Sequence, residues 1–132
     1  MNAQPHQILL IDDDRNLRTM LTRALGRFGY TVAEAENGRE ALARLETATF
    51  QLVVTDIIMP DMEGIELILK LRRSMPQLPV IAMSAGGRIG PDSYLSLAKR
   101  SGAVLTLVKP FGIDEFIAAV KSVMEKPAPA AA

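Results

Sequence analysis

Short apolar runs and longer stretches with a helical repeat alternate along the chain. Five runs predict strands, at residues 7–12, 30–35, 51–56, 79–83 and 103–108. Between them, apolar residues recur every three to four positions, which is typical of helices that bury one face. These helices are expected to begin near residues 14, 37, 65, 92 and 113. Mostly apolar strands that alternate with helices predict a three-layer α/β fold, a five-stranded parallel sheet covered on both faces by five helices.

The same repeat predicts which helical side chains point into the core. The expected inward residues are Leu17, Met20, Leu21, Ala24, Leu25 and Phe28 in the first helix, Ile65, Ile68, Leu69 and Leu71 in the third, and Phe116, Ile117, Val120 and Val123 or Met124 in the fifth. We expect Gly26 and Gly29 to end the first helix and Pro76 to stop the third. Asn37, followed three residues later by Glu40, has the spacing of a capping box and predicts the start of the second helix.

The length and the composition fit one domain without a strongly charged partner. We expect a domain over residues 7–125, between a polar tail (1–6) and a Pro/Ala-rich tail or linker (126–132). Acidic and basic residues number 15 each, so no net field favours nucleic acid or an anionic membrane. The absence of cysteine excludes disulfides, thiolate catalysis and zinc ribbons. No signal-peptide pattern and no run of about 20 apolar residues is present, so a cytoplasmic location is expected.

Polar side chains stand at the ends of the predicted strands. Asp56 ends an apolar run, where an unpaired carboxylate would be costly. Three aspartates, residues 12–14, follow the first strand, while Ser84 and Lys109 follow the fourth and fifth. Because the carboxyl ends of parallel strands meet at one edge of a sheet, where such folds bind ligands, we expect these side chains to converge.

Converging carboxylates call for a compensating cation. Two or three carboxylates within a few ångström raise one another's pKa values, and a hard divalent ion with oxygen ligands removes that repulsion. A lysine would add a second positive charge, and a serine would add a neutral hydrogen-bond donor. Carboxylates, Mg²⁺ (or Mn²⁺), lysine and hydroxyl together describe a site for phosphoryl transfer, in which one carboxylate could be the nucleophile.

In their types and their order, these motifs resemble the receiver domain of bacterial two-component response regulators, a family that includes the chemotaxis regulators. The motifs are Asp12-Asp13, Asp56 before Met59-Pro60, Ser84-Ala85 and Lys109-Pro110-Phe111, and the resemblance covers residues 7–125. Each motif alone is weak, but their common order and their places at predicted strand ends are specific. The resemblance implies the flavodoxin-like strand order 2-1-3-4-5.

The resemblance also implies which residue accepts the phosphoryl group and which bind the metal. Asp56 would accept it from a histidine of a partner kinase or of a histidine phosphotransfer protein. Asp13 and Asp56 would bind Mg²⁺ directly, with the backbone carbonyl of Ile58 as a third ligand. Asp12 would act mainly through a metal-bound water. Such a protein catalyses only its own phosphorylation and dephosphorylation and is otherwise no enzyme.

Other residues are assigned to the phosphate and to the switch. Ser84 would bond a phosphoryl oxygen, and Lys109 would pair with Asp56 and then with the phosphate. The Lys109–Pro110 peptide bond is usually cis in this family. Switch and output positions would be Thr106, Ala85, Gly86 and Pro110.

Three features depart from the family pattern. Thr106 stands where an aromatic ring is common, so the usual coupled switch is in question. The Ser84-to-Lys109 separation is a few residues longer than usual, through a loop at residues 85–91 with three glycines. Ile58 and Gly86 stand at positions that tune the access of water to the acyl phosphate, and an apolar Ile58 predicts a fairly long-lived phosphorylated state.

The expected output is a contact with a downstream protein, through the face of the fourth and fifth strands and their helices. No direct nucleic-acid or membrane binding is expected, and the domain would be a monomer or a weak dimer. A haloacid-dehalogenase-like phosphatase is the alternative, since Asp12, Asp14, Ser84 and Lys109 mimic its nucleophile and partners. It would need a later acidic pair and usually a longer chain, and it leaves Asp56 unexplained. A flavodoxin fits less well, because the acidic loop after the first strand would repel a phosphate.

Overall fold

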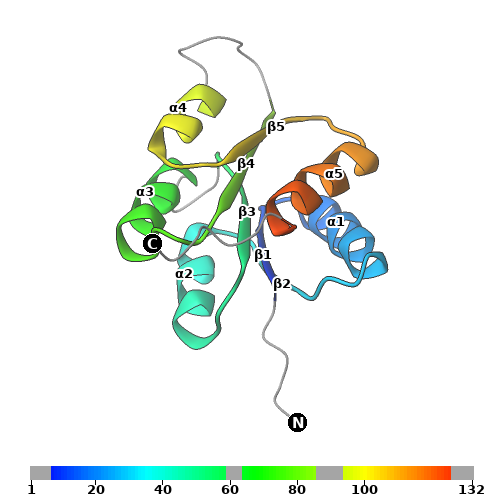
Figure 1. Cartoon of the computed structure of the whole chain (residues 1–132), viewed down its shortest axis with the longest axis horizontal. Coiled ribbons are helices and arrows are strands. Elements are labelled where there is room, and N and C mark those ends of the chain that lie inside the picture. The colour runs from blue at the N-terminus through cyan, green and yellow to red at the C-terminus, as the bar shows by residue number, and fades with distance from the viewer. Residues whose placement is uncertain (1–6, 59–63, 86–93, 126–132) are drawn as a thin grey trace.

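The computed structural model describes residues 7–58, 64–85 and 94–125 (Figure 1). Within these residues five strands alternate with five helices, as the hydrophobic pattern predicts. The elements are β1 (Ile8–Ile11), α1 (Arg15–Arg27), β2 (Val32–Ala35), α2 (Gly38–Thr47), β3 (Leu52–Asp56), α3 (Gly64–Ser74), β4 (Val80–Ala85), α4 (Tyr94–Ser101), β5 (Leu105–Lys109) and α5 (Ile113–Met124). None of these helices has the length and apolarity needed to cross a bilayer.

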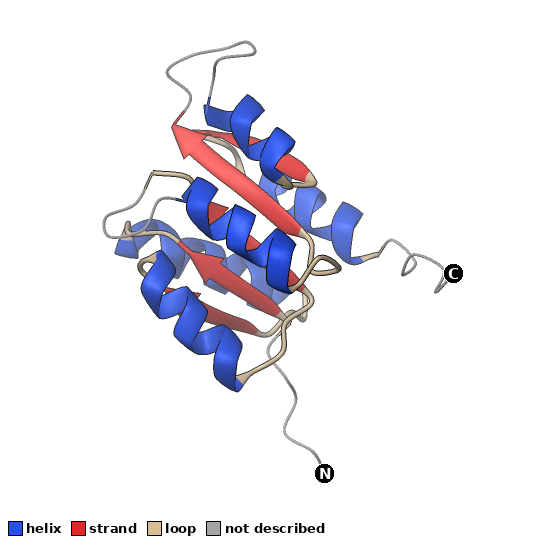
Figure 2. Ribbon diagram, turned by 90° about the vertical axis from the view of Figure 1, so that its left-hand side faces the viewer, coloured by secondary structure: helices blue, strands red, loops and turns tan. Residues whose placement is uncertain are grey.

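The strands form one parallel sheet in the order β2-β1-β3-β4-β5, which confirms the predicted topology. Helices α1 and α5 cover one face, and α2, α3 and α4 cover the other (Figure 1). Figure 2 looks onto the layer of α2, α3 and α4, with the strands behind it. The central strands β1 and β3 are buried along their whole length, which explains their continuous apolar runs.

The helix faces were predicted only in part. Buried Leu21, Ala24 and Leu25 form the core side of α1, but Met20 and Phe28 are 47% and 51% exposed. In α3, Leu69 is 46% exposed, whereas Leu67, which the prediction omitted, is fully buried. The predicted sets were wider than one helix face. Successive residues are about 100° apart around a helix, so Leu69 lies on the side of α3 away from Leu67, Ile68 and Leu71. In α5, Phe116, Ile117 and Val120 are buried as expected.

The glycines near the end of α1 differ in their roles. Gly26 lies inside the helix and does not end it. Gly29, at φ 88°, adopts the left-handed conformation that favours glycine, and the N–H groups of Gly29 and Tyr30 donate to the carbonyls of Gly26 and Leu25. Gly29 is therefore the residue that reverses the chain after α1.

Asn37 begins α2 as predicted, and its Oδ1 accepts from the N–H of Glu40 at 2.8 Å. The Glu40 carboxylate reaches back to the N–H of Glu36, one residue before the cap. We expect Asn37→Ala to lower the free energy of unfolding by about 1 kcal/mol, because a helix-terminal N–H loses its partner. Urea unfolding checks this against Arg39→Ala on the exposed side of α2. An equal loss in both variants would contradict it.

Candidate functional site

Three aspartates meet at the carboxyl end of the sheet. Asp12 and Asp13 follow β1, and Asp56 ends the neighbouring strand β3. One carboxylate oxygen from each lies within 4.8 Å of the others. Asp12 and Asp56 are buried, while Asp13 is exposed. The cluster is therefore set into the sheet edge but opens to solvent on the side of Asp13.

Backbone N–H groups orient two of these carboxylates. Asp12 Oδ1 accepts from the N–H of Asp14 at 2.8 Å, and Asp56 Oδ1 accepts from the N–H of Ile57 at 2.9 Å. Asp14 also caps α1, because its Oδ1 accepts from the N–H of Leu17 at 3.1 Å. The chain that carries the acids is thus fixed by the start of α1 and by the turn after β3.

Lys109, the last residue of β5, brings a cation to the cluster. Its Nζ lies 2.6 Å from Asp12 Oδ2 and 3.6 Å from Asp56 Oδ2. The sequence predicted a pair with Asp56, and that contact exists, but the shorter bond to Asp12 was missed. The Lys109–Pro110 bond is cis, as expected. Phe111 stacks on the ring of Phe116 at 5.6 Å between centroids, which packs the turn after β5 against α5.

Burial and charge shift the pKa values in this cluster. Burial, and then the nearby charge of Asp12, raise the pKa of Asp56 to about 6, although Lys109 opposes the shift. Burial also raises the pKa of Asp12 above its ordinary value, against the bonds from Lys109 and Asp14. For Lys109, burial alone would lower the pKa, but the bond to Asp12 and the charges of Asp12 and Asp56 outweigh it and raise the pKa. Lys109 therefore stays charged at neutral pH, and Asp56 changes its protonation state at about pH 6.

Ser84 and Ile58 lie near the acids in the fold. Ser84 is buried near the end of β4, in register with Val108, one residue before Lys109. Ile58 follows Asp56 by two residues, and the residue is 53% exposed. Its backbone carbonyl as a metal ligand remains a prediction.

The predicted switch residues lie on β4, β5 and the turn that follows. Thr106 is half-buried on β5 opposite Ala82, on the sheet face that α4 covers. Ala85 ends β4 as the register partner of Lys109, and Pro110 is exposed. Gly86 and most of the long loop lie outside the described residues. The effect of Thr106 on switching therefore stays a prediction.

Two residues that contact this site were absent from the predicted set. The Arg18 guanidinium donates through Nη1 to the carbonyl oxygen of Asp12 at 2.7 Å. Gly64, the first residue of α3, donates its N–H to the carbonyl of Ile57 at 2.6 Å. Two features of the sequence indicated these positions: an arginine follows the acidic triplet by one helical turn, and a glycine opens a helix. Neither feature indicates which backbone atom Arg18 or Gly64 contacts.

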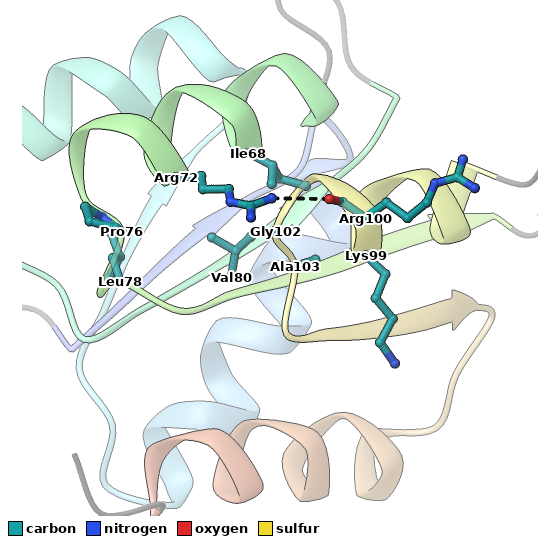
Figure 3. Close-up of a pocket in the computed structure, with 9 residues that line it drawn as sticks. All are labelled: Ile68, Arg72, Pro76, Leu78, Val80, Lys99, Arg100, Gly102 and Ala103. Atoms are coloured by element: carbon teal, nitrogen blue, oxygen red, sulfur yellow. Dashed lines mark hydrogen bonds between the residues drawn. The ribbon is translucent and has the colours of Figure 1, made fainter. Parts of the chain in front are cut away.

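Two hollows lie at the opposite end of the sheet from the acids. A cleft of about 280 Å³ between α3 and α4 is lined by Ile68, Arg72 and Gly102 among others (Figure 3). There Arg72 Nη1 donates to the carbonyl of Arg100 at 3.3 Å and bridges the two helices. A broader groove of about 990 Å³ includes Phe50, Met75 and Met124. Neither is lined by a residue of the acidic cluster.

The donor set of the acidic cluster suits a hard divalent cation. Three carboxylate oxygens within 4.8 Å of one another fit an ion that takes oxygen ligands, and the exposed side at Asp13 leaves room for water ligands. The cluster is compatible with the divalent metal site of receiver domains.

Comparisons with known proteins agree with this geometry. Residues 8–121 match the family model described as the response regulator receiver domain. The DNA-binding transcriptional regulator NtrC of Salmonella typhimurium is 40% identical over 114 residues, 86% of this chain but only 24% of the length of that relative. Among solved structures, the receiver domain of NtrX from Brucella abortus has a TM-score of 0.83 at 27% identity, over 92% of this chain and 100% of that one. The chemotaxis response regulator CheY4 of Vibrio cholerae has a TM-score of 0.81 at 30% identity, over 91% and 99%. The chain belongs to the response regulator receiver domain family.

Proposed function

We propose that this chain is a phosphorylation-driven signalling switch in which Asp56 accepts a phosphoryl group in a Mg²⁺-dependent reaction. The observation that carries the proposal is the meeting of the Asp12, Asp13 and Asp56 carboxylates with the Lys109 ammonium. The donor would be a phosphohistidine of a histidine kinase or of a histidine phosphotransfer protein. The chain would catalyse only its own phosphorylation and dephosphorylation.

In the proposed phosphoryl transfer, each residue of the site has a separate role. An Asp56 carboxylate oxygen attacks phosphorus, and the new O–P bond forms as the N–P bond of the donor breaks. The departing imidazole keeps the electron pair and takes a proton from water. A bound Mg²⁺ supplies positive charge for the phosphoryl oxygens, and Asp12, Asp13 and Asp56 would hold it. Lys109, 3.6 Å from Asp56, would pair with the phosphoryl group, and the Ser84 hydroxyl would donate to it.

The output would be a shift between an inactive and an active form that a protein partner distinguishes. The face of β4 and β5 with their helices would make that contact. Because the chain spans about a quarter of the length of NtrC, the controlled part could equally be another domain of a longer protein. No direct contact of this domain with nucleic acid or membrane is proposed, and a cytoplasmic setting fits the kinase donor.

Intact-mass measurement after incubation with Mg²⁺ and acetyl phosphate tests the proposal. We expect wild type to gain the mass of one phosphoryl group, and Asp56→Ala to gain none. Asp114→Ala, which removes an exposed carboxylate at the start of α5, should gain it as wild type does. Phosphorylation that survives Asp56→Ala would refute the acceptor. Turnover of a phosphomonoester that needs Asp12 would instead favour the phosphatase alternative.

The affinity for Mg²⁺ is expected to fall as the pH drops below about 6. The pKa of Asp56 is about 6, so below that pH a proton must leave this carboxylate before the cation binds, with a loss of up to about tenfold per pH unit. Above that pH the carboxylate is already ionised and the affinity should level off. Calorimetric titration with MgCl₂ at several pH values checks this. Asp13→Asn should weaken binding but keep the profile, while constant affinity across this range would contradict the expectation.

A further inference from the structure

Arg18 joins the first helix to the chain segment that carries two of the acids. Its side chain is only 13% exposed, which is low for an arginine. Nη1 donates to the carbonyl oxygen of Asp12 at 2.7 Å, and Nε donates to Glu34 Oε1 at 3.1 Å. The guanidinium is therefore held by a carboxylate on one side and holds a backbone oxygen on the other.

The backbone of Glu34 is itself fixed. It lies in β2, in register with Leu10 of β1, and its carbonyl oxygen accepts from Arg44 Nε of α2 at 2.8 Å. The Glu34 side chain is 35% exposed on the edge strand β2, where a charged residue is common, and its carboxylate pairs with Arg18. The fork of the guanidinium can serve the carboxylate and the carbonyl together, which a lysine ammonium does less well.

The contact to Asp12 reaches the peptide unit that leads to Asp13. The N–H of Asp12 donates to the carbonyl of Ala35, and its carboxylate is held by Asp14 and Lys109. The carbonyl oxygen of Asp12 belongs to the planar unit that joins it to Asp13. Fixing that oxygen therefore fixes the direction in which Asp13, the exposed acid of the cluster, leaves the sheet edge.

We propose that Arg18, oriented by Glu34, is a positioning residue that holds the peptide between Asp12 and Asp13 so that both carboxylates are placed for a divalent cation. The inference rests on the proposed function. For the removal of Arg18, it predicts a change in Mg²⁺ affinity opposite in sign to the change that loss of the positive charge alone would cause. A guanidinium close to a cation site repels the cation, so its removal by charge alone would tighten Mg²⁺ binding. Loss of positioning would weaken binding.

Calorimetric titration of the full chain with MgCl₂ at about pH 8 separates the two effects. Arg18→Ala is expected to bind Mg²⁺ roughly tenfold more weakly than wild type, the usual order for loss of a group that orients a metal ligand. Arg15→Ala is the matched control, because it removes the same charge from an exposed position in the first turn of α1. It should bind within about twofold of wild type, or more tightly.

Three further variants keep the test informative if Arg18→Ala does not fold, as circular dichroism would reveal. Arg18→Lys keeps the charge without the fork and should bind Mg²⁺ more weakly than wild type. Glu34→Ala frees the guanidinium and should weaken binding more than Glu34→Gln, which removes the same negative charge but keeps an oxygen acceptor for Arg18 Nε. Arg18 and Glu34→Ala variants that bind as tightly as Arg15→Ala would overturn the inference while the proposed function stands. A wild-type chain that binds no Mg²⁺ would overturn both.

Discussion

Asp56→Asn is expected to raise the free energy of unfolding of the metal-free protein by about 2 kcal/mol at about pH 8. The pKa of the buried Asp56 is about 6 against an ordinary 3.8, so the ionised carboxylate opposes folding at neutral pH. The folded state binds this proton more tightly than the unfolded chain. Wild-type stability therefore falls as the pH rises from about 4 to about 6, and the full cost is present above that range. Asparagine does not ionise, so the Asp56→Asn variant avoids this loss of stability.

Urea unfolding in the presence of a chelator, at about pH 4.5 and about pH 8, measures this difference. The advantage of Asp56→Asn should be small at the lower pH and large at the higher one. Asp13→Asn is the control, because that carboxylate is exposed, and its effect should stay within about 0.5 kcal/mol. Saturating Mg²⁺ should shrink the advantage of Asp56→Asn, since the cation compensates the wild-type charge. A destabilised Asp56→Asn at about pH 8 would contradict the electrostatic account of this site.

Gly64→Ala is expected to lower the free energy of unfolding by about 3 kcal/mol or more. A Cβ at this position would lie 2.6 Å from Ile57 Cα and 3.0 Å from the Ile57 carbonyl oxygen, so backbone must move. The Gly64 N–H also donates to that carbonyl. Because the N–H of Ile57 orients the Asp56 carboxylate, the displacement should also slow phosphorylation of whatever protein remains folded.

Gly26→Ala is the matched control for this substitution. Gly26 lies in α1, and no heavy atom comes within 4 Å of a Cβ built there. Alanine in a helix is favoured over glycine, so this variant should gain about 0.5–1 kcal/mol. Urea unfolding of both variants measures the contrast. A Gly64→Ala variant as stable as wild type would contradict the close packing of the start of α3 against the turn after β3.

The features that were predictable from the sequence are those fixed by periodicity and by chain direction. Apolar runs placed the strands, and parallel strands bring their carboxyl ends to one edge, so Asp12, Asp56 and Lys109 could be grouped without knowing any distance. The cap at Asn37 was also predictable, because a helix start leaves N–H groups that such a side chain satisfies locally.

The features that escaped prediction depend on distances between elements. Nothing in the spacing of Lys109 says that it lies closer to Asp12 than to Asp56; that follows from where β5 ends relative to β1 and β3. The contact of Arg18 with a backbone oxygen leaves no pattern in side-chain polarity. Met20 and Leu69 were placed inward because they are apolar, yet a helix on a sheet buries only the narrow stripe that touches the strands.

Localising the phosphoryl group tests the central claim most directly. After incubation with Mg²⁺ and acetyl phosphate, borohydride reduction converts an aspartyl phosphate to homoserine, which peptide mass spectrometry can place in the chain. We predict homoserine at position 56 in wild type, none without Mg²⁺, and none anywhere in Asp56→Ala. Homoserine at Asp12 or Asp13, or a phosphoryl group that persists in Asp56→Ala, would contradict the account.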